Sequence, residues 1–254
     1  MNKIRVVENK IIPFDNDFVR IEGSKITFIN NGNFYIEYID SNNVNIEIVL
    51  EDNVCISLFE YSNNRNININ NYYSLYRNSS LIVSKFYSND TTNETINVYL
   101  KEDKANIKYN FSSVSNYDDK YTINIYHEGM KTSSDIYNRT VAKEESSNFF
   151  DINSYVNNGI KDCYLNQHTK IITLGESNNR INPNMFIGEE STTAVHSSTI
   201  GSINKDDLFY MMSRGIDYNT SINLIVKGMI LSNINVNMEI REKILKILDR
   251  LGGE

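Results

Sequence analysis

Short runs of apolar and β-branched residues, each closed by a turn signal, fill the sequence from about residue 24 to about residue 155. The run 26–29 ends in Asn-Asn-Gly, and the run 44–50 ends in Glu-Asp-Asn. Residues 45–48 read Asn-Ile-Glu-Ile, the period-two alternation that a strand with one buried face requires. Regular short strands with frequent turns and no helical pattern between them predict an all-β core. Further runs lie at residues 34–39, 54–61, 81–87, 96–100, 105–111 and 121–127.

The periodicity alone leaves three all-β architectures open: a sandwich, a barrel and a solenoid. No clean repeat of fixed length is visible, so the pattern by itself does not favour a solenoid. Residues 62–71, Ser-Asn-Asn-Arg-Asn-Ile-Asn-Ile-Asn-Asn, are locally of low complexity, and we expect a mobile turn there.

The pattern becomes helical after Gly201. Asn204 is a suitable cap for a helix that begins near Lys205 and stops at Gly215, a natural residue just past a helix end. Asp217 can cap a second helix. A third, over about residues 237–251, places isoleucines and leucines on one stripe. We therefore divide the chain into an N-terminal segment (1–23), a β core (24–203) and a C-terminal helical domain (204–254).

Composition and charge exclude several partners. The formal net charge of −7 gives the chain no general reason to collect on phosphate backbones, so nucleic acid is not expected. No stretch approaches the roughly 20 apolar residues that span a bilayer, and the first 18 residues contain no apolar core of a signal peptide. We expect a cytoplasmic protein that neither enters a membrane nor binds ATP, since no phosphate-binding Gly-rich loop ending in Gly-Lys-Ser/Thr occurs.

Residues 188–228 contain four short motifs in fixed order, Ala194-Val195-His196, Thr199-Ile200-Gly201, Leu208-Phe209-Tyr210 and Ser213-Arg214-Gly215-Ile216. In order and spacing these motifs resemble the C-terminal signature shared by SufB and SufD, the scaffold proteins of SUF iron–sulfur cluster assembly. Weaker resemblance extends back through 183–187, 167–175, 149–159 and 126–134, so it covers roughly residues 95–254. The first ninety or so residues match no family motif, and the long N-terminal helical regions of larger relatives are not expected here.

The resemblance implies a right-handed parallel β-helix (a β-solenoid) closed by a small helical domain. It also implies a scaffold rather than an enzyme, paired with a SufB-type subunit and docked to the SufC ATPase. An iron–sulfur cluster would then be held only transiently and shared with the partner subunit.

The resemblance singles out His196, which matches a family histidine that lies at the subunit seam in SufD-like members. It is our candidate cluster ligand, although a lone histidine in a β-rich core is otherwise a hydrogen-bonded structural residue. SufB-like members carry a cysteine at or near Thr169 and a glutamate at Ser197, so both departures indicate a SufD-like chain. Cys163, a few residues from that position, is a weaker candidate ligand, and a small buried hydrophobic residue is its alternative role.

The other histidines and the second cysteine carry weaker expectations. His127 lies in a family-like segment and is expected to be structural. His168 is expected to be an exposed turn residue, and Cys55 to be structural. The two cysteines are too few for a disulfide framework and lack metal-ligand spacing.

The helical domain offers a second functional surface. The resemblance suggests that part of it docks the SufC-type ATPase, while the rest packs against the end of the β-helix. Arg214 of this domain could pair with an acidic group of the partner. The candidate partner-binding residues are Leu208, Phe209, Tyr210, Met212, Arg214 and Gly215.

Three other functions remain open from the residues. One is a homodimeric scaffold in which this chain fills both the SufB and SufD roles. Another is a β-helical polysaccharide-binding protein, lyase or hydrolase, for which we find no cluster of acids. The third is a purely structural paralogue that has lost cluster chemistry.

Overall fold

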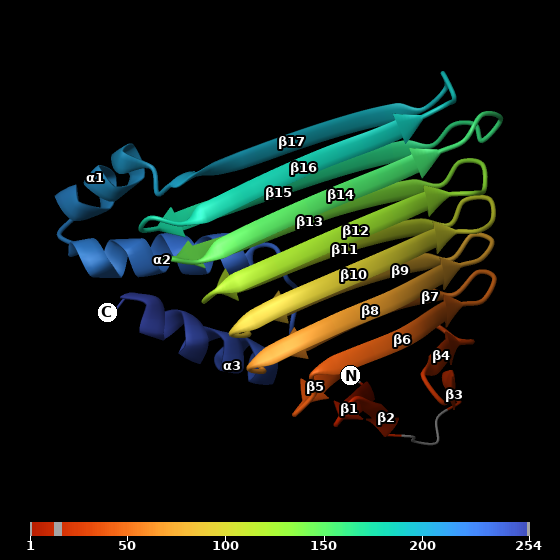
Figure 1. The fold of residues 1–254 in the computed structure, drawn as a ribbon, viewed down its shortest axis with the longest axis horizontal. Helices are drawn as coiled ribbons and strands as arrows, with labels where there is room; N and C mark the ends of the chain where they lie inside the picture. Colours follow the sequence, from red (N-terminus) through yellow and green to blue (C-terminus); the bar gives the residue numbers. More distant parts are fainter. Residues whose placement is uncertain (1, 13–16, 253–254) are drawn as a thin grey trace.

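The computed structural model describes residues 2–12 and 17–252 (Figure 1). One sheet contains the strands β1 (Asn2–Val7), β2 (Lys10–Ile12), β5 (Gly32–Ile39), β7 (Cys55–Ser62), β9 (Ser80–Tyr87), β11 (Asn106–Ser115), β13 (Ser133–Lys143), β15 (Tyr164–Leu174) and β17 (Thr193–Ser202). The other contains β3 (Val19–Glu22), β4 (Lys25–Phe28), β6 (Asn43–Leu50), β8 (Asn66–Leu75), β10 (Thr91–Leu100), β12 (Asp118–His127), β14 (Ser147–Val156) and β16 (Asn178–Ile187). The helices are α1 (Lys205–Ser213), α2 (Tyr218–Leu231), α3 (Met238–Leu248) and the 3₁₀ turn η1 (Asp249–Gly252).

From β5 onward, successive strands alternate between the two sheets, and each strand pairs in parallel with the strand two places further along the chain. The chain therefore winds as a two-sheet solenoid, one strand of each sheet per turn (Figure 1). The parallel β-helix and the small C-terminal helical domain expected from the sequence are confirmed. Within the described residues, no helix is both long and apolar enough to cross a membrane.

The alternating runs form this structure because their inward residues stack from turn to turn. Ile96 pairs with Ile123, and Ile123 with Ile152, so the three make one buried column between the sheets. Each backbone group in such a column finds its hydrogen-bond partner on the neighbouring turn, which satisfies the buried amides and carbonyls.

The length of one turn drifts along the chain. Asn68 and Asn93, stacked on adjacent turns, are 25 residues apart, whereas Asn153 and Asn184 are 31 apart. The turns between strands absorb the extra residues, so no repeat of fixed length appears in the sequence. The mobile turn expected at 62–71 is wrong: β8 begins at Asn66, and Ile67 and Ile69 point into the core. Asparagines at the outward positions disguised this strand.

A second apolar cluster joins the helical domain to the odd-numbered sheet. Each of the odd-numbered strands from β5 to β15 carries one or two large apolar side chains on its outward face, and α2 and α3 cover these side chains. Asn233, just after α2, donates hydrogen bonds to the backbone carbonyls of Phe111 (2.8 Å) and Tyr137 (3.1 Å). The buried members are Tyr35, Phe59, Phe86, Val114, Val141, Ile172, Ile203, Val226, Ile230, Ile234, Ile240, Ile244 and Leu248.

The helix boundaries expected from capping residues are confirmed. The side chains of Asn204, Asp217 and Asn237 accept backbone N–H groups in the first turns of α1, α2 and α3. Gly215 follows Arg214, the C-cap residue of α1, and has a φ of +85°, the left-handed conformation that ends helices.

One ionic cluster lies inside the solenoid. The Lys85 ammonium is 2.9 Å from Glu60 and 3.0 Å from Glu94, and all three side chains are essentially inaccessible to solvent. The hydroxyls of Tyr38 (2.8 Å) and Tyr73 (2.6 Å) donate to the two Glu60 oxygens. No sequence motif marks this cluster, although the two-residue period of β9 places Lys85 on the same face as core residues.

Candidate partner interface and cluster site

The two ends of the solenoid differ. At the N-terminal end, β2 and β3 pair antiparallel with β1 and β4 and terminate the sheets. At the opposite end, β17 and β16 are the last strands of their sheets, and in the described residues no strand pairs with their outer edges (Figure 1). Unpaired edges expose a row of backbone donors and acceptors that favour pairing with another chain. We call β16 and β17 together the open end.

His196 lies on β17 in this open end. It pairs in register with Gln167 of β15, whose side chain is buried inside the solenoid, so His196 belongs to the inward-facing column. The histidine is nevertheless exposed, because no further turn covers it. The structure therefore places the candidate ligand where a second chain added to the open end would meet it.

The interior beneath His196 is polar. Gln167 donates to the Ser154 hydroxyl at 2.8 Å, and Asn138 donates to the Thr169 hydroxyl at 3.0 Å. Thr169 is buried in this layer. Four hydrogen-bonding side chains therefore lie in the interior next to the open end, in columns that hold Phe111 and Ile136 on earlier turns.

The rim of the open end is apolar. On the outer face of the even-numbered sheet, the rings of Tyr99, Tyr126, Tyr155 and Phe186 stack in sequence with centroids 4.8–4.9 Å apart. The last ring of this ladder, Phe186, is 53% exposed because no further turn stacks on it. Ile187, Val195 and Ile200 are also exposed on these two strands.

Cys163 does not adjoin His196. It lies just before β15, four residues from the register partner of His196, or about 13 Å along the strand. Its side chain is buried beside Val156 and Leu165, and its sulfur is 3.3 Å from the Thr132 hydroxyl. Across the described residues, no group of three or more His, Cys, Asp or Glu side chains is placed to hold a metal ion.

His127 is buried in a hydrogen-bonded site near Cys163. Its Nδ1 lies 2.7 Å from the Thr132 hydroxyl, and its Nε2 lies 3.0 Å from the Ser134 hydroxyl. Thr132 donates its own proton to the Gly129 carbonyl, so Nδ1 carries the proton and Nε2 accepts from Ser134. Burial lowers the pKa of His127 to about 4, and the ring is neutral at pH 7.

Acid is therefore expected to destabilise the protein through His127. The unfolded chain binds a proton at the ordinary pKa of 6.5 and the folded chain only near 4, so stability is lost as pH falls through this range. His127→Asn should reduce the loss between pH 7.5 and pH 5 by about 2 kcal/mol, measured by urea unfolding at both values. Burial raises the pKa of Asp119 to about 6, so the titration of Asp119 changes stability in the opposite direction as pH falls. Asp119 is present in both the wild type and the His127→Asn variant, so its contribution cancels when their acid losses are compared. An unchanged acid loss in the variant would contradict this role.

Two expectations about single residues are revised by the structure. His168 is not in a turn: it lies on β15, half-buried, with its ring stacked on Tyr137 at a centroid distance of 5.1 Å. Cys55, expected to be structural, is a free and exposed thiol at the start of β7.

The expected partner-binding residues form an exposed apolar surface on α1. The exposed fractions are 76% for Phe209, 61% for Tyr210 and 47% for Met212, whereas Leu208 is half-buried against the helical domain. The Arg214 guanidinium lies 5.4 Å from the centre of the Tyr210 ring, a cation–π contact. Gly215 ends the helix, so that α2 turns back against the sheet.

Parallel strands in two sheets, one uncovered end and a docked helical domain define a β-solenoid protein. A family model described as "SUF system FeS cluster assembly, SufBD core domain" matches residues 18–229. The chain belongs to this SufBD core family. The iron–sulfur cluster assembly protein SufD of Bacillus subtilis (strain 168) is 24% identical over 135 residues, which cover 52% of this chain and 31% of that protein.

The structure also brings together basic residues that the sequence motifs did not single out. Arg139 on β13 and Lys170 on β15 are register partners on the outer face of the sheet, beside α2. They could have been noticed only with the register known, because 31 residues separate them in the sequence.

Proposed function

We propose that this chain is a SufD-like scaffold subunit for iron–sulfur cluster assembly, acting in the cytoplasm as a binding platform and not as an enzyme. One observation carries the proposal: the open end combines two unpaired strand edges, an apolar rim and the exposed His196. Membership of the SufBD core family and the similarity to a SufD protein support it.

The partner at the open end is proposed to be a SufB-type subunit. Added strands would satisfy the free edge groups of β16 and β17 and cover the exposed rings and aliphatic side chains at the rim. This pairing would bury His196 at the seam. Since His196 is the candidate ligand exposed there in the part of the chain that the structure describes, the remaining ligands for the transient cluster would come from the partner.

The SufC-type ATPase is proposed to dock on α1 through Phe209, Tyr210 and Met212. These side chains are far more exposed than is usual for residues of their size, and exposed apolar patches mark interaction sites. Because α2 and α3 are anchored to the odd-numbered sheet, force applied at α1 can reach the strands that end at the seam.

The test combines the chain with a SufB-type subunit and a SufC-type ATPase from one organism, followed by co-purification and cluster reconstitution monitored by visible absorption. His196→Ala should retain both partners and lose most of the bound cluster, whereas Ser198→Ala, on the same face of β17, should retain it. Phe209→Ser combined with Tyr210→Ser should release the ATPase, whereas Met238→Ser, an equally exposed residue on α3, should not.

Two outcomes would contradict parts of this proposal. Equal cluster content in the His196→Ala and Ser198→Ala complexes would remove His196 from the site. A chain that forms a stable dimer by light scattering and ignores the SufB-type subunit would favour a homodimeric scaffold over the SufD-like role.

A further inference from the structure

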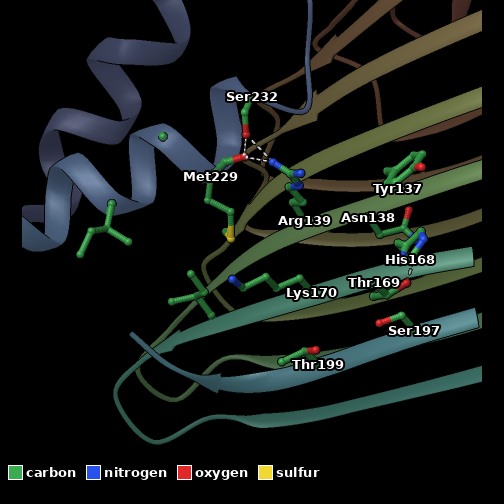
Figure 2. A pocket seen from close by; sticks show the side chains of 13 residues that line it. Tyr137, Asn138, Arg139, His168, Thr169, Lys170, Ser197, Thr199, Met229 and Ser232 are labelled. Carbon is green, nitrogen blue, oxygen red and sulfur yellow. Dashed lines mark hydrogen bonds between the residues drawn. The ribbon is translucent and has the colours of Figure 1, made fainter. Parts of the chain in front are cut away.

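A pocket opens between the outer face of the odd-numbered sheet and α2 (Figure 2). Its volume is about 520 Å³, within the range of small-molecule sites. The walls come from three adjacent strands, β13, β15 and β17, and from the side of α2 that faces them. The residues that shape the pocket are Tyr137, Arg139, His168, Lys170, Ser197 and Thr199.

The pocket is hollow because, in two rows of paired residues that cross the strands, the side chains become smaller toward β17. Tyr137 and His168 stack on adjacent strands, but the next position in that column is Ser197. In the neighbouring column, Lys170 is followed by the much shorter Thr199 (Figure 2). On the helix side, Gly228 lines the cavity, and a Cβ there would meet no atom within 4 Å.

The pocket is basic although the chain is acidic. Arg139 and Lys170 occupy directly paired positions on adjacent strands, where like charges repel. Among the described residues, no aspartate or glutamate lines the pocket, while the whole chain carries a net charge of −7. The nearest outward carboxylate on β13, Asp135, is two residues from Tyr137 and accepts a hydrogen bond from Asn166 at 3.0 Å.

The two cations differ in what holds them. Arg139 is fixed by α2, since one guanidinium nitrogen donates to the Met229 carbonyl at 2.9 Å and to the Ser232 hydroxyl (Figure 2). Its remaining N–H groups are left for other acceptors. Lys170 is exposed, and among the described residues no carboxylate or carbonyl engages its ammonium group. Hydroxyl donors, Thr199 and Ser197, lie on the adjacent strand.

We propose that this pocket binds the phosphate group of a small metabolite. Two adjacent cations and neighbouring hydroxyls supply several charge-assisted donors, which suit a doubly charged tetrahedral oxyanion better than a single carboxylate. The bound anion would relieve the repulsion between Arg139 and Lys170. The volume left beyond the phosphate, beside His168 and above Ser197, accommodates the organic part of the ligand. The site lies on the opposite face of β17 from His196 and does not depend on the proposed scaffold role.

The test is a titration of the full-length protein with inorganic phosphate and with ribose 5-phosphate at constant ionic strength, followed by amide NMR shifts. Saturable shifts are expected for residues 168–170 and 197–199. Lys170→Met should weaken phosphate binding about tenfold, the effect of one lost charge-assisted hydrogen bond. Lys120→Met, which removes an exposed lysine from the other sheet, should leave the affinity unchanged.

Each outcome bears on the proposal. Tighter binding of ribose 5-phosphate than of inorganic phosphate would show that the organic part is also recognised, and equal binding would assign recognition to the phosphate alone. The proposal is overturned if the wild-type protein shows no saturable shifts, if both lysine variants weaken binding equally, or if acetate binds as tightly as phosphate.

Discussion

Lys85→Met is expected to lower the free energy of unfolding by about 4 kcal/mol, because it leaves two buried carboxylates without their cation. Burial pushes the pKa of Lys85 down, but the Glu60 and Glu94 carboxylates outweigh burial and hold it well above its usual value. Burial raises the pKa of Glu94, and Lys85 opposes that rise. Without the ammonium group, the core must retain uncompensated negative charge or take up protons.

Urea unfolding of the full chain at pH 7.5 measures this loss. Lys120→Met, the same change at an exposed strand position, should alter stability by less than about 0.5 kcal/mol. A triple variant, Lys85→Met with Glu60→Gln and Glu94→Gln, should recover part of the loss because neutral amides can still accept the tyrosine hydroxyls. A Lys85→Met protein as stable as the wild type would show that the ionic cluster contributes little to folding.

This cluster shows how far the sequence leads. If residues 81–87 form a strand, the two-residue period places Lys85 on the same face as Leu81 and Val83. That placement alone predicts a buried lysine. Its partners cannot be read from the sequence, because Glu60 belongs to the preceding turn and Glu94 to the opposite sheet, and pairing them requires the register.

The open end illustrates the same limit. Family motifs located His196 and the apolar residues of α1, while helix caps located α1 and α2 and an apolar stripe located α3. The local sequence pattern gave a wrong prediction for His168, which was expected in a turn. His168 is an outward-facing residue of β15, and its ring stacks on that of Tyr137. The phosphate pocket was invisible for a further reason, since it depends on which side chains lie next to each other across turns of 29 to 31 residues.

Gly129→Ala is expected to destabilise the protein by more than about 3 kcal/mol, because the added methyl group has no space. An ideal Cβ on Gly129 would lie 2.1 Å from the Glu102 carbonyl carbon and 2.5 Å from the Asp103 nitrogen. Both are backbone atoms of the preceding turn of the solenoid, so no side-chain rotation relieves the overlap. Gly129 also donates its N–H to the Leu100 carbonyl at 3.0 Å, which holds the two turns together.

The matched control is Gly201→Ala, near the end of β17, where an added Cβ meets no atom within 4 Å. Thermal and urea unfolding of the two variants should differ clearly, with Gly201→Ala close to the wild type. The alanine at 129 acts by separating adjacent turns, so amide hydrogen exchange should quicken in residues 100–103 and 127–132 before it does so elsewhere. Equal stability of the two variants would mean that neighbouring turns can slide apart at little energetic cost, contrary to the rigid stack on which the open end and its histidine depend.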